Sequence, residues 1–153
     1  MSRTVNKDTI DLIKSFEGLS LKGYHDSIDP SNVNTIGYGT IAYPDGTKVK
    51  VGDIITQDQA YEYLTWEVNQ KASVITPMIK SILNDNQFGA LVSFAYNLGE
   101  GNLKSSTLLK KVNINPNDLT IRDEFIKWNK SNGNVIAGLT RRRIAEADLY
   151  FKN

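Results

Sequence analysis

Three side chains near the start of the chain have the types and spacing needed for acid-catalysed cleavage of a glycosidic bond. Glu17 ends a run with helical periodicity, and Asp26 and Thr35 follow in a segment rich in turn residues. If the chain reverses after Gly18 and returns as a strand, Asp26 and Thr35 face Glu17 across a groove. A carboxylate and a hydroxyl held there could orient a water, as in inverting glycosidases, whose two carboxyl groups stand roughly 6.5 to 9.5 Å apart. Taken singly, Glu17 also fits an exposed helix end and Thr35 an ordinary β-branched strand residue.

The position of Glu17 predicts a raised pKa. Apolar residues recur before it at helical spacing: Ile10, Ile13 and Phe16. A cap at Asn6 or Asp8 and a left-handed Gly18 would bound this helix and place Glu17 in its last turn. The exposed carbonyls there carry a partial negative charge, which favours the protonated acid and raises its pKa. A proton donor at neutral pH needs that shift.

Three motifs occur in order along the chain. They cover residues 16–26 with 35–40, residues 90–99 with 105–109, and residues 128–129 with 138–146. Together they resemble the phage-type lysozymes, or endolysins, of glycoside hydrolase family 24, best known from the T-even coliphages, over residues 8–151. The resemblance implies hydrolysis of the β-1,4 bond between N-acetylmuramic acid and N-acetylglucosamine in peptidoglycan. It also implies Glu17 as the general acid, with Asp26 and Thr35 positioning the water.

The chain departs from the family pattern at two places. Eight residues separate Asp26 from Thr35, whereas family members usually have five. Asp29 has the five-residue spacing and is the alternative second carboxylate, but Asp26 keeps the family distance from Glu17 and is preferred. Thr40 stands where many relatives carry His, which removes a possible ion-pair partner without touching the proposed chemistry.

Composition limits the classes of function. The chain has 153 residues, 40% of them hydrophobic and 23% charged, as in an ordinary globular protein. The formal net charge of +1 argues against nucleic-acid binding. There is no cysteine, and His25 is the sole histidine, so neither a histidine-based metal site nor a Ser-His-Asp triad is expected. We interpret His25 as a partly exposed strand residue, and we expect no metal or cofactor.

Residues 141–143 form the only basic run of note, Arg-Arg-Arg. We interpret it as a solvated face of the last helix with one arginine turned inward to a carboxylate. The functional alternative is attraction of an anionic cell-wall polymer.

The predicted fold is α+β and lysozyme-like, with a small amino-terminal lobe that holds a short antiparallel sheet and a larger helical lobe, joined by a long helix. Residues 1–153 are expected to form a single catalytic domain, with lobes at about 14–60 and at 1–13 plus 61–153 and a cleft between them. Strands are predicted at about 35–43 and 47–51, joined by a turn at 44–46. Helices are predicted from a capping box at 56–59 toward residue 75, after Pro77, from 84–87, and around 108–112, 121–128 and 144–151.

Residues 1–15 lack an apolar run of signal-peptide or anchor length, so we expect the protein to be made and kept in the host cytoplasm. The resemblance then implies release by a holin, action on the wall or periplasm in host cell lysis, and a monomer. Three other readings remain. They are a lytic transglycosylase, a non-catalytic wall-binding module on a lysozyme scaffold, and a nucleic-acid binder using residues 141–143.

Overall fold

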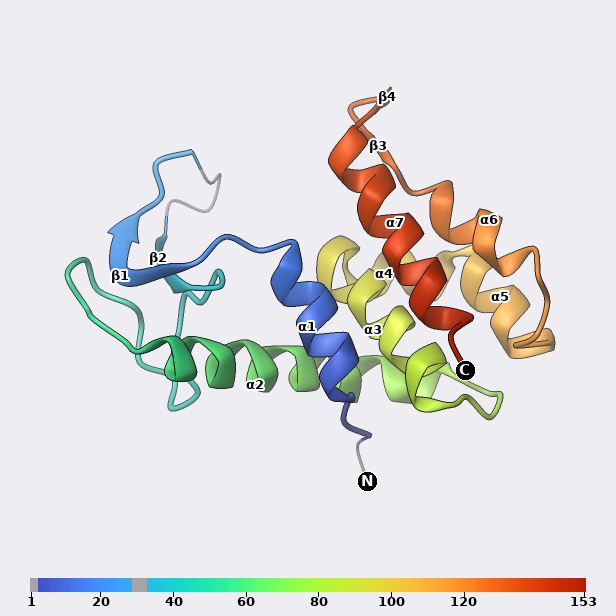
Figure 1. Cartoon of the computed structure of the whole chain (residues 1–153), viewed down its shortest axis with the longest axis horizontal. Coiled ribbons are helices and arrows are strands. Elements are labelled where there is room, and N and C mark those ends of the chain that lie inside the picture. Colours follow the sequence, from blue (N-terminus) through green and yellow to red (C-terminus); the bar gives the residue numbers. More distant parts are fainter. Residues whose placement is uncertain (1–2, 29–32) are drawn as a thin grey trace. The chain divides into compact units, whose positions relative to one another are not determined.

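The computed structural model describes residues 3–28 and 33–153, which contain seven α-helices and two short antiparallel sheets (Figure 1). The predicted α+β class is confirmed. The chain divides into two compact units. We call Ile13–Glu67 the sheet unit and the residues up to Leu12 together with Val68–Asn153 the helical unit. Helix α2, Gln57–Ile75, begins in the first and ends in the second.

Helix α1, Lys7–Ser15, begins at a side-chain cap. Asn6 Oδ1 accepts a hydrogen bond of 3.1 Å from the backbone N–H of Thr9, so Asn6 is the cap. The predicted end of the helix is wrong, because Gly18 does not have a positive φ. The chain leaves the helix instead through three-residue turns, in which Glu17 N–H donates to the Lys14 carbonyl at 3.1 Å. Glu17 therefore lies two residues beyond α1 rather than in its last turn.

Two antiparallel strands follow, β1, Ser20–His25, and β2, Asn34–Gly37. The predicted return of the chain as a strand after Gly18 is confirmed. Tyr24 pairs with Thr35, and the register shifts between Ser20 and Tyr24.

The predicted strand at 35–43 is too long, and the one predicted at 47–51 is reduced to an isolated antiparallel bridge between Ala42 and Lys48. Strand β2 stops because Gly37 and Gly39 have φ of 64° and 97°, values that side chains other than glycine rarely adopt. Ile36 and Thr40 exchange backbone hydrogen bonds of 2.9 and 2.8 Å around them, which closes a tight turn. The turn at 44–46 is confirmed, since Gly46 N–H donates to the Tyr43 carbonyl at 2.8 Å.

Capping boxes start two helices; the first was predicted as a capping box, and the second only as a helix start. Thr56 and Gln59 exchange side-chain to backbone hydrogen bonds of 2.9 and 3.1 Å at the start of α2. Asn84 and Gln87 do the same for α3, Asp85–Leu98. Helix α3 is buried along most of its length and forms the centre of the helical unit.

The other elements of the helical unit surround α3 or extend from it. They are α4, Glu100–Ser105; α5, Thr107–Ile114; α6, Ile121–Ile126; α7, Ala137–Tyr150; and a hairpin of β3, Lys130–Ser131, with β4, Asn134–Val135. Helix α7 packs against α3 and α6 (Figure 1). Phe94 makes edge contacts with Phe125 and Trp128, with ring centroids 6.0 and 5.5 Å apart. The sequence did not predict α4 or the hairpin.

The helix predicted after Pro77 is wrong. The chain makes only one 3₁₀ turn, Thr76–Met78. The backbone N–H of Lys80 then donates to Asn113 Oδ1 at 2.8 Å instead of to an upstream carbonyl, so no further turn forms.

The prediction for residues 141–143 is partly wrong: an arginine does turn inward to a carboxylate, but two arginines, Arg142 and Arg143, are buried rather than one. Arg143 Nε lies 2.7 Å from Glu146 Oε1, and Arg142 Nε lies 3.4 Å from Glu146 Oε2. Glu146 lies four residues after Arg142 and three after Arg143, so both arginines can reach its carboxylate. Of the three arginines, only Arg141 is exposed.

Candidate active site

A hollow of about 490 Å³ on the sheet unit brings together the three residues singled out from the sequence. Its lining consists of Glu17, Gly18, Leu19, Ser20, Tyr24, Asp26, Thr35, Gly39 and Ile41. Larger hollows exist on the same unit. This one is of interest because it holds Glu17, Asp26 and Thr35 together.

The β1–β2 pairing positions Asp26 and Thr35. Thr35 lies opposite Tyr24, and Asp26 comes just after β1, where its N–H donates to the Val33 carbonyl at 3.3 Å. The carboxylate of Asp26 accepts a hydrogen bond of 3.1 Å from the N–H of Ile28, which orients it. Thr35 is only 7% exposed, so its side chain is held by packing at the wall of the hollow.

Glu17 reaches the hollow from the turn after α1. Its N–H is held by the Lys14 carbonyl, and its side chain is half-buried. The raised pKa of Glu17 stays a prediction.

Large apolar side chains also line the hollow: Leu19, Tyr24 and Ile41. All three are exposed, although such residues are usually buried. Apolar walls beside a few convergent polar groups are the usual composition of a ligand pocket, and they suit the faces of sugar rings. Strand alternation could have identified Tyr24, which lies two residues before Asp26. Ile41 had no local signal, because its place depends on the turn through Gly37 and Gly39.

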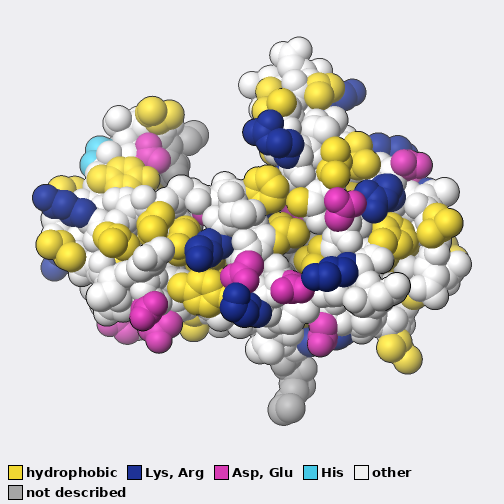
Figure 2. All heavy atoms as spheres, in the orientation of Figure 1, with side chains coloured by type: hydrophobic (Ala, Val, Ile, Leu, Met, Phe, Trp, Pro, Cys, Tyr) yellow, Lys and Arg dark blue, Asp and Glu magenta, His cyan; other side chains and the backbone are white. Residues whose placement is uncertain are grey.

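The remaining residues discussed from the sequence lie as follows. Asp29, the alternative second carboxylate, lies outside the described residues. Thr40 is fully buried, and it is not part of the described lining of the hollow. His25 is exposed in β1, as predicted, and its ring is visible in cyan in Figure 2; its Nδ1 lies 3.1 Å from Asn34 Oδ1.

Within residues 3–28 and 33–153, no three His, Cys, Asp or Glu side chains are grouped so that they could hold a metal ion. In that same part of the chain, no helix combines the length and the apolar character needed to cross a bilayer.

Comparison with known proteins gives a consistent family. The model of the phage lysozyme family matches residues 14–146. The endolysin of Bacillus phage B103 is 40% identical over 146 residues, which cover 95% of this chain and 53% of the relative. The chain thus spans about half the length of the Bacillus phage endolysins that it matches.

Two solved structures are similar over nearly their whole length. The endolysin of Escherichia coli O157:H7 phage FAHEc1 superposes with a TM-score of 0.83 at 37% identity, covering 97% of this chain and 94% of that one. The muramidase domain of SpmX from Asticaccaulis excentricus gives a TM-score of 0.81 at 29% identity, covering 99% and 100%.

Proposed function

Because this chain belongs to the phage lysozyme family, we propose that it is a muramidase that hydrolyses the β-1,4 bond between N-acetylmuramic acid and N-acetylglucosamine in bacterial peptidoglycan. The observation that carries this proposal is the meeting of Glu17, Asp26 and Thr35 in one hollow. Both units are assigned to one catalytic domain. Helix α2, which contributes residues to each, is consistent with that assignment.

In the proposed reaction, Glu17 donates a proton to the glycosidic oxygen as the bond to the muramic acid anomeric carbon breaks. Asp26 accepts a proton from a water that attacks that carbon from the opposite face, and Thr35 Oγ1 orients the same water. One proton leaves Glu17 and one reaches Asp26, so the charge balances and no cofactor is needed. The exposed faces of Leu19, Tyr24 and Ile41 would contact the sugar rings.

The biological setting belongs to the proposal as well. We place the enzyme in host cell lysis, held in the host cytoplasm until a holin gives it access to the wall, where it acts on the glycan strands as a monomer. The endolysin names of the relatives support this setting.

The test is mass spectrometry of the fragments released from purified peptidoglycan, with Glu17→Gln run in parallel. We expect reducing muramic acid ends from the wild-type protein and at least a 100-fold lower rate from Glu17→Gln, since a positioned general acid contributes about 10²–10⁴-fold. Glu62→Gln, an exposed glutamate of α2 in the same unit, is the matched control and should keep the wild-type rate.

Other outcomes would each point to a different function. Anhydromuramic ends would mean a lytic transglycosylase, which needs no water. Sedimentation with the wall without fragments would mean a binding module. A folded Glu17→Gln protein with the wild-type rate would remove Glu17 from the mechanism. Comparing Asp26→Asn with Asp29→Asn identifies the second carboxylate, and we expect the larger loss from Asp26→Asn.

A further inference from the structure

The helical unit carries a second hollow, of about 510 Å³, which the proposed reaction does not use. Three lysines line it, Lys80, Lys104 and Lys110, and apolar side chains complete it, among them Val74, Met78 and Leu109. All three lysines are exposed. The hollow thus combines positive charge with an apolar wall.

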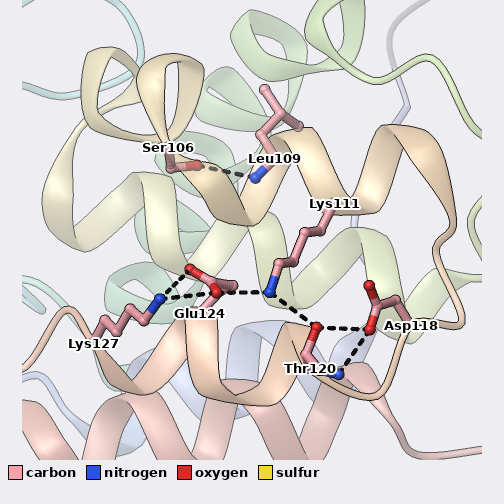
Figure 3. Close-up of polar contacts among 7 residues, drawn as sticks. All are labelled: Ser106, Leu109, Lys111, Asp118, Thr120, Glu124 and Lys127. Carbon is pink, nitrogen blue, oxygen red and sulfur yellow. Dashed lines mark hydrogen bonds and ion pairs between the residues drawn. The ribbon is translucent and has the colours of Figure 1, made fainter.

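These lysines differ from their neighbours in having no acidic partner. Within the described residues, none of the three forms an ion pair. Lys111 and Lys127, by contrast, both bind Glu124, at 2.8 and 3.0 Å (Figure 3). Since the whole chain has a formal charge of only +1, three ammonium groups without an ion pair among the described residues are a local excess of positive charge that favours an anionic partner.

Hydrogen bonds fix one edge of this hollow before any ligand arrives. Asn113 in α5 accepts from the N–H of Lys80 at 2.8 Å and donates to the Met78 carbonyl at 3.0 Å. The ammonium group of Lys80 donates to the Pro77 carbonyl at 3.0 Å. The segment after α2 is therefore attached to α5.

Two isoleucines lie within two residues, along the sequence, of residues that line the hollow, and both are almost entirely exposed to water. Ile82, two residues after Lys80, is 95% exposed, and Ile114, directly after Asn113, is 85% exposed. Ser81 Oγ donates to the Val112 carbonyl at 2.8 Å, which attaches the segment before Ile82 to the end of α5. Val74 in the hollow itself is exposed as well. A hydrophilic phosphate polymer would leave these aliphatic side chains in water, whereas a lipid surface would cover them.

We propose that this surface, made of Lys80, Lys104, Lys110, Val74, Ile82 and Ile114, binds the face of an anionic phospholipid bilayer. The three ammonium groups contact lipid phosphate oxygens, and the aliphatic side chains enter the boundary between headgroups and acyl chains. Peripheral binding of this kind gains from buried apolar area and from attraction to anionic lipid together.

The test is sedimentation of the full chain with vesicles at 0.15 M salt. We expect binding to vesicles that contain phosphatidylglycerol and none to pure phosphatidylcholine. Each lysine near an anionic surface contributes about 5-fold in affinity, so the triple variant Lys80→Gln, Lys104→Gln, Lys110→Gln should bind about 100-fold more weakly. The control triple, Lys22→Gln, Lys48→Gln, Lys130→Gln, removes the same charge from other exposed lysines and should lose less than 5-fold.

A second variant separates lipid from other phosphate sources. Ile82→Ser with Ile114→Ser leaves the charge unchanged and should weaken vesicle binding several-fold. Equal losses in the two lysine triples, or no vesicle binding at all, would overturn the proposal. The proposal would also be overturned if the protein bound a glycerol phosphate polymer as tightly as it binds the vesicles and the isoleucine substitutions did not change that affinity. The altered residues are exposed, and equal melting temperatures would establish that the variants fold; peptidoglycan hydrolysis is not the readout, so failure here leaves the muramidase proposal standing.

Discussion

At the scale of the residue, Thr40 is unusual because its hydroxyl is buried and makes no hydrogen bond with the described residues. The side chain is 0% exposed, and Oγ1 has no hydrogen-bond partner among the described residues. A buried polar group left unpaired costs about 1–3 kcal/mol. The backbone of Thr40 is fully engaged with Ile36, so the cost belongs to the hydroxyl alone.

Thr40→Val should therefore stabilise the protein by about 1 kcal/mol, because valine has nearly the same shape as threonine and carries no polar group that needs a hydrogen-bond partner. For a chain of this size the melting temperature should rise by roughly 2–4 °C. Thr9→Val is the control: Thr9 is equally buried, but its Oγ1 donates to Asn6 Oδ1 at 2.8 Å, so the same change should destabilise. Calorimetry of both variants checks this, and a Thr40→Val protein as destabilised as Thr9→Val would contradict it.

The meeting of Glu17, Asp26 and Thr35 in one hollow was predictable, because a chain reversal after Gly18 and one strand pair suffice to produce it. The end of α1 was not predicted correctly, since any glycine after a helix suggests a left-handed stop and only the backbone hydrogen bonds distinguish the alternatives. The catalytic roles of the three residues stay predictions.

At the scale of the element, α1 and α3 approach so closely that only glycine fits between them. A Cβ added at Gly89 would overlap Oγ1 of Thr9 and lie 3.0 Å from its Cβ. Thr9 cannot easily move, because its hydroxyl and its N–H both bind Asn6. The helix cap and the helix packing thus depend on the same residue.

Gly89→Ala should accordingly destabilise the protein, although alanine is the better helix former. Gly101→Ala in α4 is the matched control, because a Cβ there meets nothing within 4 Å. Both changes gain about the same helix propensity, so the two variants should differ in free energy of unfolding by about 2 kcal/mol, the usual cost of overpacking. Urea unfolding measures the difference, and equal stabilities would mean that α1 shifts freely against α3.

The helix starts marked by caps were predicted well, whereas the end of α1 and the segment after Pro77 were not, for a physical reason. A cap such as Asn6, Thr56 or Asn84 acts on a backbone group three residues away, so its signal is local. The helix predicted after Pro77 failed because Asn113, far along the chain, takes the N–H of Lys80. A local stretch of sequence does not reveal that a distant side chain competes with the helical carbonyls for a backbone N–H.

At the scale of the whole molecule, one buried carboxylate ties the stability of the helical unit to pH. Glu124 in α6 accepts from Lys111 in α5 at 2.8 Å and from Lys127 at 3.0 and 3.1 Å (Figure 3). Burial alone would raise the pKa of Glu124, but the hydrogen bonds from the two lysines outweigh it and hold the pKa below its usual value. The ionised Glu124 carboxylate therefore makes its full contribution to the free energy of unfolding above the unfolded pKa of about 4.3. This contribution is lost as the pH falls through the lower pKa of the folded state.

Glu124→Gln should destabilise the protein at pH 7 by about 2 kcal/mol, the typical contribution of hydrogen bonds to a charged group. The gap to the wild type should narrow below about pH 4, where the wild-type carboxylate becomes protonated. Chemical unfolding between pH 3 and pH 7 tests this, with Glu62→Gln as the control that should follow the wild type throughout. If the difference in free energy of unfolding between the wild type and Glu124→Gln did not depend on pH, the ionised carboxylate would not contribute to stability.

The division of the chain into two units has a consequence for its synthesis. Residues up to Leu12 belong to the helical unit, where Asp8 pairs with Lys152 at 2.9 Å across 144 positions of sequence. Ile13–Glu67, in contrast, is one continuous stretch. A ribosome therefore releases every residue of the sheet unit while the first segment of the chain still lacks its partners in α3. That segment leaves the exit tunnel before the sheet unit, yet its contact with Lys152 forms only after the rest of the helical unit has been made.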